Sequence, residues 1–211
     1  MRFLSFEANG QAGIGWVKDI HATDFVNLTL AAPELPRNLK DLICAPGGLA
    51  AADAAARKAP ASAVQAMASV TMLPLIPNPG KIVCMGLNYA DHAKEGGNAR
   101  PEYPSFFLRG NSSMVGHNQP IVRPKASTQL DYEAELAVII GKQARHLTAE
   151  NALDCIAGYS CFNDGSIRVK AELVNAASTD VFSATSVSVD RSTGLVTFTD
   201  ATLAAKKGNY K

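Results

Sequence analysis

The sequence predicts an α+β fold that is mainly β, with a small region before a Pro-rich boundary and a larger β region after it. Short apolar runs bounded by turn residues recur along the chain, whereas the main helical pattern is one Ala-rich segment. Three prolines and a glycine fall within residues 73–80, where neither a helix nor a central strand can form. Many short strands with few helices are typical of α+β domains.

Composition excludes several classes of function. The chain has 211 residues, of which 47% are apolar, so it can form a core. A net charge of +1 argues against a nucleic-acid-binding surface, and no apolar run reaches the roughly 20 residues needed to span a bilayer. The start of the chain lacks a secretory signal, which predicts a cytoplasmic protein. We expect reduced, mostly buried thiols and no zinc site from the cysteines, which are Cys44, Cys84, Cys155 and Cys161.

The first region, residues 1–73, predicts a small α+β unit. Residues 3–6 and 14–17 are expected as strands around a turn-rich loop. The Ala-rich segment 49–69 predicts two short helices, which Pro60 separates, and Ser62 is the expected cap of the second helix.

A linker over residues 74–80 leads into the second region, residues 81–211. Five strands are expected there, the first buried and the fourth central, at residues 81–86, 105–108, 120–122, 136–140 and 159–162. Short helices are expected at residues 89–95 and from Thr148 to about residue 157, and a hairpin is expected between residues 187–189 and 195–198.

Two glutamates just before the central strand suggest a metal site. Side chains alternate along a strand, so Glu133 and Glu135 point the same way and repel each other. A hard cation such as Mg²⁺, Mn²⁺ or Ca²⁺ would resolve that repulsion. The alternative is a solvated end of an edge strand. Asp164 follows another apolar strand and can supply a third carboxylate, although the Asn-Asp-Gly sequence there is also typical of an Asx turn.

His92 and Glu95 form a candidate acid–base pair. Positions three apart share a face of a helix, so the Glu95 carboxylate can fix the imidazole tautomer and leave the other nitrogen as a base. The alternative is a solvated pair on an exposed helix face.

These pieces, in this order, resemble the fumarylacetoacetate hydrolase family. The residues that carry the resemblance are 81–95, 104–109, 130–141, 157–159 and 163–164. The resemblance implies a mixed-strand β-roll, usually dimeric, with a small variable N-terminal domain. It also implies activity on acylpyruvates and related 2-oxo acids, by C–C bond hydrolysis, decarboxylation or isomerisation.

The resemblance assigns roles to individual residues. Those that match the family's metal ligands are Glu133, Glu135 and Asp164, with Mg²⁺ or Mn²⁺ as the usual ion. Those that match its water-activating pair are His92 and Glu95, on a helix that acts as a lid. The residues that match the family's substrate contacts are Arg109 and Arg168. At the position of Arg109 the family often has Lys followed by Pro.

After Arg168 the family motifs are not recognisable in the sequence. Neither the family's downstream Gln and Lys nor its late Thr-Gly-Thr-Pro-like loop is found in residues 169–211. Three interpretations follow: a truncated or frame-shifted member whose roll is incomplete at the C-terminus, a divergent member whose tail completes the roll, or a member that binds metal or a small carboxylate without turnover. The main hypothesis is a metal-dependent hydrolase or lyase that cleaves a C–C bond in an acylpyruvate or a related 2-oxo acid.

Overall fold

The structure, a computed structural model, describes residues 1–90, 101–125 and 127–167, and the backbone of four further strands up to residue 204. The chain divides into two compact units, one of residues 1–120 with 140–157 and one of residues 121–139 with 158–211. The predicted division into residues 1–73, 74–80 and 81–211 stays a prediction.

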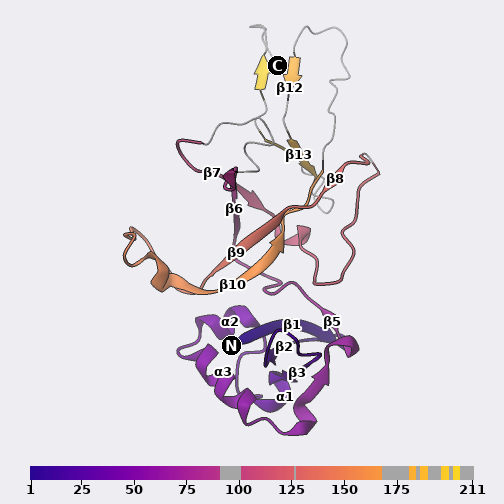
Figure 1. Ribbon diagram of the computed structural model, residues 1–211, viewed down its shortest axis with the longest axis vertical. Coiled ribbons are helices and arrows are strands. Elements are labelled where there is room, and N and C mark those ends of the chain that lie inside the picture. Colours follow the sequence, from indigo (N-terminus) through magenta and orange to yellow (C-terminus); the bar gives the residue numbers. More distant parts are fainter. Residues whose placement is uncertain are drawn as a thin grey trace, which may run out of the picture. The chain divides into compact units, whose positions relative to one another are not determined.

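The described elements are mainly strands, as the sequence predicts (Figure 1). Three α-helices are described: α1 (Leu28–Ala31), α2 (Leu39–Cys44) and α3 (Gly48–Arg57). Four short 3₁₀ helices are described: η1 (Ala61–Ala63), η2 (Met67–Ser69), η3 (Asn111–Ser113) and η4 (Ala152–Cys155). The strands are β1 (Arg2–Ala8), β2 (Gln11–Val17), β3 (Asp24–Asn27), β4 (Val64–Ala66), β5 (Thr71–Met72), β6 (Ile82–Gly86), β7 (Ser105–Arg109), β8 (Leu130–Asp131), β9 (Ala134–Ile140), β10 (Ile156–Asn163), β11 (Ser166–Ile167), β12 (Val181–Ser183), β13 (Ser186–Val189), β14 (Val196–Thr199) and β15 (Thr202–Ala204).

The N-terminal sheet has five antiparallel strands in the order β4-β3-β2-β1-β5. The two strands predicted at its start are confirmed, and both are longer than expected. Asn9 and Gly10 join β1 to β2 with φ values of 52° and 74°. Positive φ at both positions is the requirement of a type I′ turn, for which Asn-Gly is the preferred sequence. The turn therefore needs only two residues, and the rest of the expected loop extends the strands.

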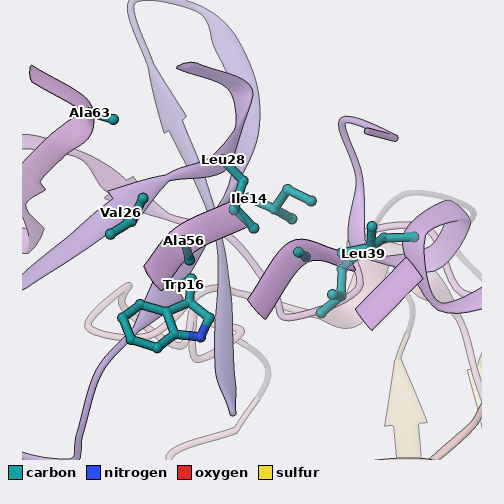
Figure 2. Packing of buried hydrophobic residues seen from close by; sticks show 9 residues of the cluster. Ile14, Trp16, Val26, Leu28, Leu39, Ala56 and Ala63 are labelled. Atoms are coloured by element: carbon teal, nitrogen blue, oxygen red, sulfur yellow. The ribbon is translucent and has the colours of Figure 1, made fainter. Parts of the chain in front are cut away.

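One face of this sheet packs on the helices. Ile14 and Trp16 of β2 and Val26 of β3 lie in a buried cluster whose helical members include Leu39 and Ala56 (Figure 2). Leu42, which is 0% exposed, belongs to the same cluster. Because the helices present small alanines and leucines to the strands, they form a second layer that excludes water.

The opposite face depends on two glycines. The rings of Phe6 and Phe25 lie 4.9 Å apart between centroids, and both are buried. A Cβ atom at Gly13 would lie 2.7 Å from Phe6, and one at Gly15 would lie 2.3 Å from Phe25. Aromatic rings commonly cover glycines of a neighbouring strand in this way. The alternation of Gly with Ile14 and Trp16 thus serves both faces of β2.

A polar contact joins β2 to α3. The Trp16 indole N–H donates to Asp53 Oδ1 over 2.7 Å, and Arg57 Nε donates to Asp53 Oδ2 over 2.8 Å. The Arg57 guanidinium also lies 5.6 Å from the centre of the Trp16 ring, which is within the range of a cation–π contact. These bonds lower the pKa of Asp53, with the Arg57 bond as the largest cause and the Trp16 bond as the second.

The second helix predicted in the Ala-rich segment is wrong. The first is confirmed as α3, but after Pro60 the chain forms η1, β4 and η2. Val64 pairs with Val26, so β4 extends the sheet as an edge strand, and Ser62 lies inside η1 instead of capping a helix. Pairing with β3 here outweighs the weak helical preference of single alanines.

The Pro-rich segment, residues 73–80, forms no helix or strand, as predicted. Beyond it, β6 and β7 pair antiparallel, with Ile82 opposite Arg109. Both strands were predicted, but the expected burial of the first is wrong, because Val83 and Met85 are exposed. The strand predicted at residues 120–122 is also wrong, since no regular element forms there.

The predicted central strand is confirmed as a strand, β9, but among the described residues it pairs with β10 alone. The helix predicted from Thr148 is wrong. The Asn151 side chain accepts the Thr148 N–H at 2.8 Å, which closes a turn, and only the short η4 follows before β10. The predicted strand at residues 159–162 and the hairpin formed by β13 and β14 are confirmed. Most of the helix predicted at residues 89–95 lies outside the described residues.

Candidate functional site

The candidate site lies at one end of the hairpin formed by β9 and β10. Exposure alternates along β9, so that Glu135, Ala137 and Ile139 are partly covered whereas Leu136 and Val138 are exposed. Glu133, two residues before Glu135, is also partly covered. This pattern agrees with the predicted placement of the two glutamates on one face.

Asp164 lies directly across from Glu133. Its backbone N–H donates to the Glu133 carbonyl over 2.9 Å, just beyond the end of β10. Its residue is only 6% exposed, although it carries a carboxylate. A charge in such a place requires hydrogen bonds, an ion pair or a cation, because burial without compensation is costly.

Regular pairing between the two strand segments stops at this point and resumes further along. Beyond the interruption, Asp131 of β8 pairs with Ser166 of β11. Within the interruption, Glu133 N–H donates to the side-chain oxygen Oδ1 of Asn163 over 2.9 Å. A side chain therefore supplies an acceptor at a position where a ladder normally uses a backbone carbonyl.

The structure brings the backbones of Glu133 and Asp164 together and places Glu135 on the same face as Glu133. Within the described residues, however, no three His, Cys, Asp or Glu side chains form a group that could hold a metal ion. The donor set itself suits Mg²⁺ or Mn²⁺, since three carboxylates supply hard oxygen ligands. The shared metal centre stays a prediction.

Of the two predicted substrate-binding arginines, Arg109 is described. It ends β7, opposite Ile82, and is partly buried. Arg168 and the predicted acid–base pair, His92 and Glu95, lie outside the described residues.

The expectation of mostly buried thiols is wrong. Cys155 is buried and Cys84 is intermediate, whereas Cys44 and Cys161 are exposed. All four are free. Cys161 belongs to the face of β10 that also exposes Tyr159, and this face has no covering layer among the described elements.

Sequence reasoning missed the role of Asn163. The Asn-Asp-Gly sequence predicts either a third carboxylate, from Asp164, or a local Asx turn, and neither interpretation gives the Asn163 side chain a partner in the other strand. In the structure the Asn163 oxygen accepts a hydrogen bond from a residue 30 positions away. The sequence shows that Asn163 adjoins the candidate ligand Asp164. Its partner, the Glu133 N–H, can be identified only once the strand pairing is known.

Comparison with known families gives one match. Residues 81–204 match the C-terminal domain of fumarylacetoacetate (FAA) hydrolase. The matched residues continue past Arg168, the position after which the sequence alone showed no family motif.

Curated relatives carry several activities in their names. Human mitochondrial oxaloacetate tautomerase FAHD2A is 36% identical over 144 residues, which cover 68% of this chain and 45% of that protein. The Escherichia coli 4-hydroxyphenylacetate degradation bifunctional isomerase/decarboxylase is 47% identical over 96 residues, covering 45% of this chain and 22% of that protein. The chain thus spans less than half the length of these relatives.

Solved structures show the same fold. Maleylpyruvate hydrolase from Sphingobium sp. SYK-6, in complex with manganese(II) and pyruvate, superposes with a TM-score of 0.62 at 27% identity, over 81% of this chain and 60% of that one. Fumarylacetoacetate hydrolase from Exiguobacterium antarcticum gives a TM-score of 0.57 at 32% identity, over 78% of this chain and 55% of that one.

No helix in the described part of the chain has the length and hydropathy of a membrane span.

Proposed function

Because the chain belongs to the fumarylacetoacetate hydrolase family, we propose that it is a metal-dependent hydrolase that cleaves a C–C bond in an acylpyruvate or a related 2-oxo acid. The observation that carries the proposal is the hydrogen-bonded pairing of Glu133 with Asp164, beside Glu135 on the same strand face. We also propose that the fold is a mixed-strand β-roll with a small N-terminal domain.

The ligands proposed for Mg²⁺ or Mn²⁺ are Glu133, Glu135 and Asp164. When bound, the ion would supply positive charge that stabilises the negative charge developing on the 2-oxo acid. Asp164 is mostly removed from water, and a bound cation would add a favourable interaction to those that this residue already makes within the protein.

The residues proposed to activate water are His92 and Glu95. Glu95 orients the imidazole, and His92 takes a proton from water so that hydroxide attacks the distal carbonyl. The bond between that carbonyl carbon and the adjacent methylene then breaks, which releases a carboxylic acid. The carbon that leaves is protonated to give the shorter 2-oxo acid. Arg109 and Arg168 are proposed to bind the substrate carboxylate, because guanidinium groups can donate two parallel hydrogen bonds to it.

A second candidate function is isomerisation or decarboxylation of a 2-oxo acid. The observation that favours it is the names of the relatives, an isomerase/decarboxylase and an oxaloacetate tautomerase. A third candidate is a catalytically silent member that binds metal or a small carboxylate. In each case we propose a cytoplasmic homodimer that acts on a small carboxylate and engages neither nucleic acid nor a membrane.

The test is turnover with Mg²⁺ or Mn²⁺ of an acylpyruvate and of oxaloacetate. We expect the carboxylic acid and pyruvate from the acylpyruvate, and we expect Glu133→Ala and His92→Ala to abolish their formation. Glu34→Ala, which removes an exposed carboxylate in the N-terminal region, serves as the matched control and retains the rate.

Each other outcome assigns one of the alternatives. Loss of CO₂ from oxaloacetate without acylpyruvate cleavage indicates a decarboxylase, and a change in its keto–enol ratio alone indicates a tautomerase. Metal binding without turnover of either compound supports the silent member. Calorimetry that detects no binding of either ion would refute the metal site.

A further inference from the structure

Besides the carboxylates, the hairpin of β9 and β10 contains an irregular hydrogen bond next to the candidate metal ligands. In an antiparallel ladder, two residues that face each other as a hydrogen-bonded pair exchange both of their N–H···O bonds. Glu133 and Asp164 keep only one of these two bonds in its regular form, from the Asp164 N–H to the Glu133 carbonyl over 2.9 Å. The Glu133 N–H donates instead to Asn163 Oδ1, also over 2.9 Å.

This exchange has a consequence for the course of the backbone. In a regular ladder the Asp164 carbonyl would accept the Glu133 N–H. Here the side-chain oxygen of Asn163, one residue earlier in the sequence, accepts it instead. The regular strand β10 ends at Asn163, and pairing resumes only between β8 and β11, at Asp131 and Ser166. The Asn163 side chain thus links the two strand segments where the backbone ladder is interrupted. Asp164, which is buried, lies within this interrupted stretch.

We propose that Asn163 is a positioning residue, which holds the Glu133 backbone in register with Asp164 so that their carboxylates converge on the ion. The inference rests on the proposed function, since it assigns Asn163 a role toward the metal ligands. Asn163 itself is not a ligand in this proposal. Its oxygen is engaged by the Glu133 N–H, and its action passes through that hydrogen bond.

The expected size of the effect follows from other metal sites. Residues that orient the ligands by hydrogen bonds typically change metal affinity by about 10- to 100-fold when they are removed. A purely structural asparagine would instead lower stability and leave the affinity of the folded protein unchanged. Metal affinity and thermal stability, measured separately, therefore distinguish the two roles.

Asn151 provides a matched control. Its side-chain oxygen also accepts a backbone N–H, that of Thr148 at 2.8 Å, in the connection between β9 and β10 at the opposite end of the hairpin. Asn151→Ala removes the same kind of hydrogen bond without touching the carboxylates.

The experiment is calorimetric titration of Mn²⁺ into the full chain, as wild type, Asn163→Ala, Asn163→Asp and Asn151→Ala, with thermal unfolding in the presence of a chelator. We expect Asn163→Ala to bind Mn²⁺ about 10-fold or more weakly. Asn163→Asp keeps an oxygen acceptor in place and retains the wild-type affinity or exceeds it. Asn151→Ala retains the affinity, although its unfolding temperature falls as that of Asn163→Ala does. Should Asn163→Ala fail to fold, Asn163→Ser, whose oxygen is one bond too short, replaces it.

Wild-type affinity in Asn163→Ala would overturn the positioning role and leave the proposed function intact. Equal weakening in Asn163→Asp and Asn163→Ala would also overturn it, since retention of the acceptor would then be irrelevant. A wild type that binds no Mn²⁺ would refute the proposed function, and this inference with it.

Discussion

The N-terminal sheet and the hairpin of β6 and β7 are built from similar apolar strands and differ in what covers them. In the sheet, helices cover one face, and Phe6 and Phe25 pack on the other. In the hairpin, the cross-strand pairs Val83–Leu108 and Met85–Phe106 share one exposed face, on which Leu108 is 68% exposed. Nearly all of the buried apolar residues among those described lie between Phe6 and Ala63. Strand pairing alone therefore does not make a core, which requires a second layer.

The largest expected effect comes from a pair of matched leucine truncations. Leu42→Ala, at a fully buried position, should lower the free energy of unfolding by about 2–5 kcal/mol. Leu136→Ala, at a position that is 60% exposed, should change it by no more than about 0.5 kcal/mol. Denaturant unfolding followed by circular dichroism measures both. A similar loss in the two variants would mean that the exposed face of β9 is covered in solution, and the contrast between the regions would not hold.

The contrast also explains which elements could be predicted from the sequence. The strands β6, β7 and β9 were predicted because their apolar runs and turn residues are local signals. The edge strand β4 was missed, since Val64–Ala66 become a strand only through pairing with β3. Burial was overestimated for residues 81–86, because periodicity shows which side chains share a face and not what covers that face.

For the candidate site, chemistry was easier to predict than geometry. The two glutamates and Asp164 stand out in the sequence because they adjoin apolar runs that are expected to be buried, where carboxylates are unusual. That Glu133 and Asp164 are hydrogen-bonded neighbours depends on the register of a pairing 31 residues apart in sequence, which no local pattern encodes. The same long-range register provides the contact between Glu133 and Asn163.

The second prediction tests the glycine face of the N-terminal sheet. Gly15→Ala places a Cβ 2.3 Å from Phe25, so the ring must move within a packed face. We expect a loss of about 1–3 kcal/mol in the free energy of unfolding, as is usual for overpacking. Fluorescence of Trp16, the only tryptophan, reports unfolding of this region. Gly80→Ala is the control, because its Cβ meets nothing within 4 Å, and a loss of equal size there would show that steric contact is not the cause.

A smaller effect on stability is expected on the exposed face of the β6–β7 hairpin. Phe106 is 61% exposed, so Phe106→Ser should leave the free energy of unfolding within about 0.5 kcal/mol of the wild type. It should also reduce the binding of an apolar fluorescent dye, since contiguous exposed apolar side chains bind such probes. Unchanged dye binding together with a loss of stability would show that another surface buries this face.

The smallest effect is a change in the pH dependence of stability at the contact between β2 and α3. Hydrogen bonds from Arg57 and Trp16 lower the pKa of Asp53 in the folded state. An unfolded Asp has a pKa of about 3.9, so the stabilisation is present above that pH and is lost as the pH falls through the lower folded-state value. Asp53→Asn should therefore lower the unfolding temperature near pH 7 and reduce its decline below about pH 4. Arg57→Gln removes the main cause of the shift and should flatten the same part of the profile. If both variants keep the acid dependence of the wild type, other groups account for it, and the contact contributes packing alone.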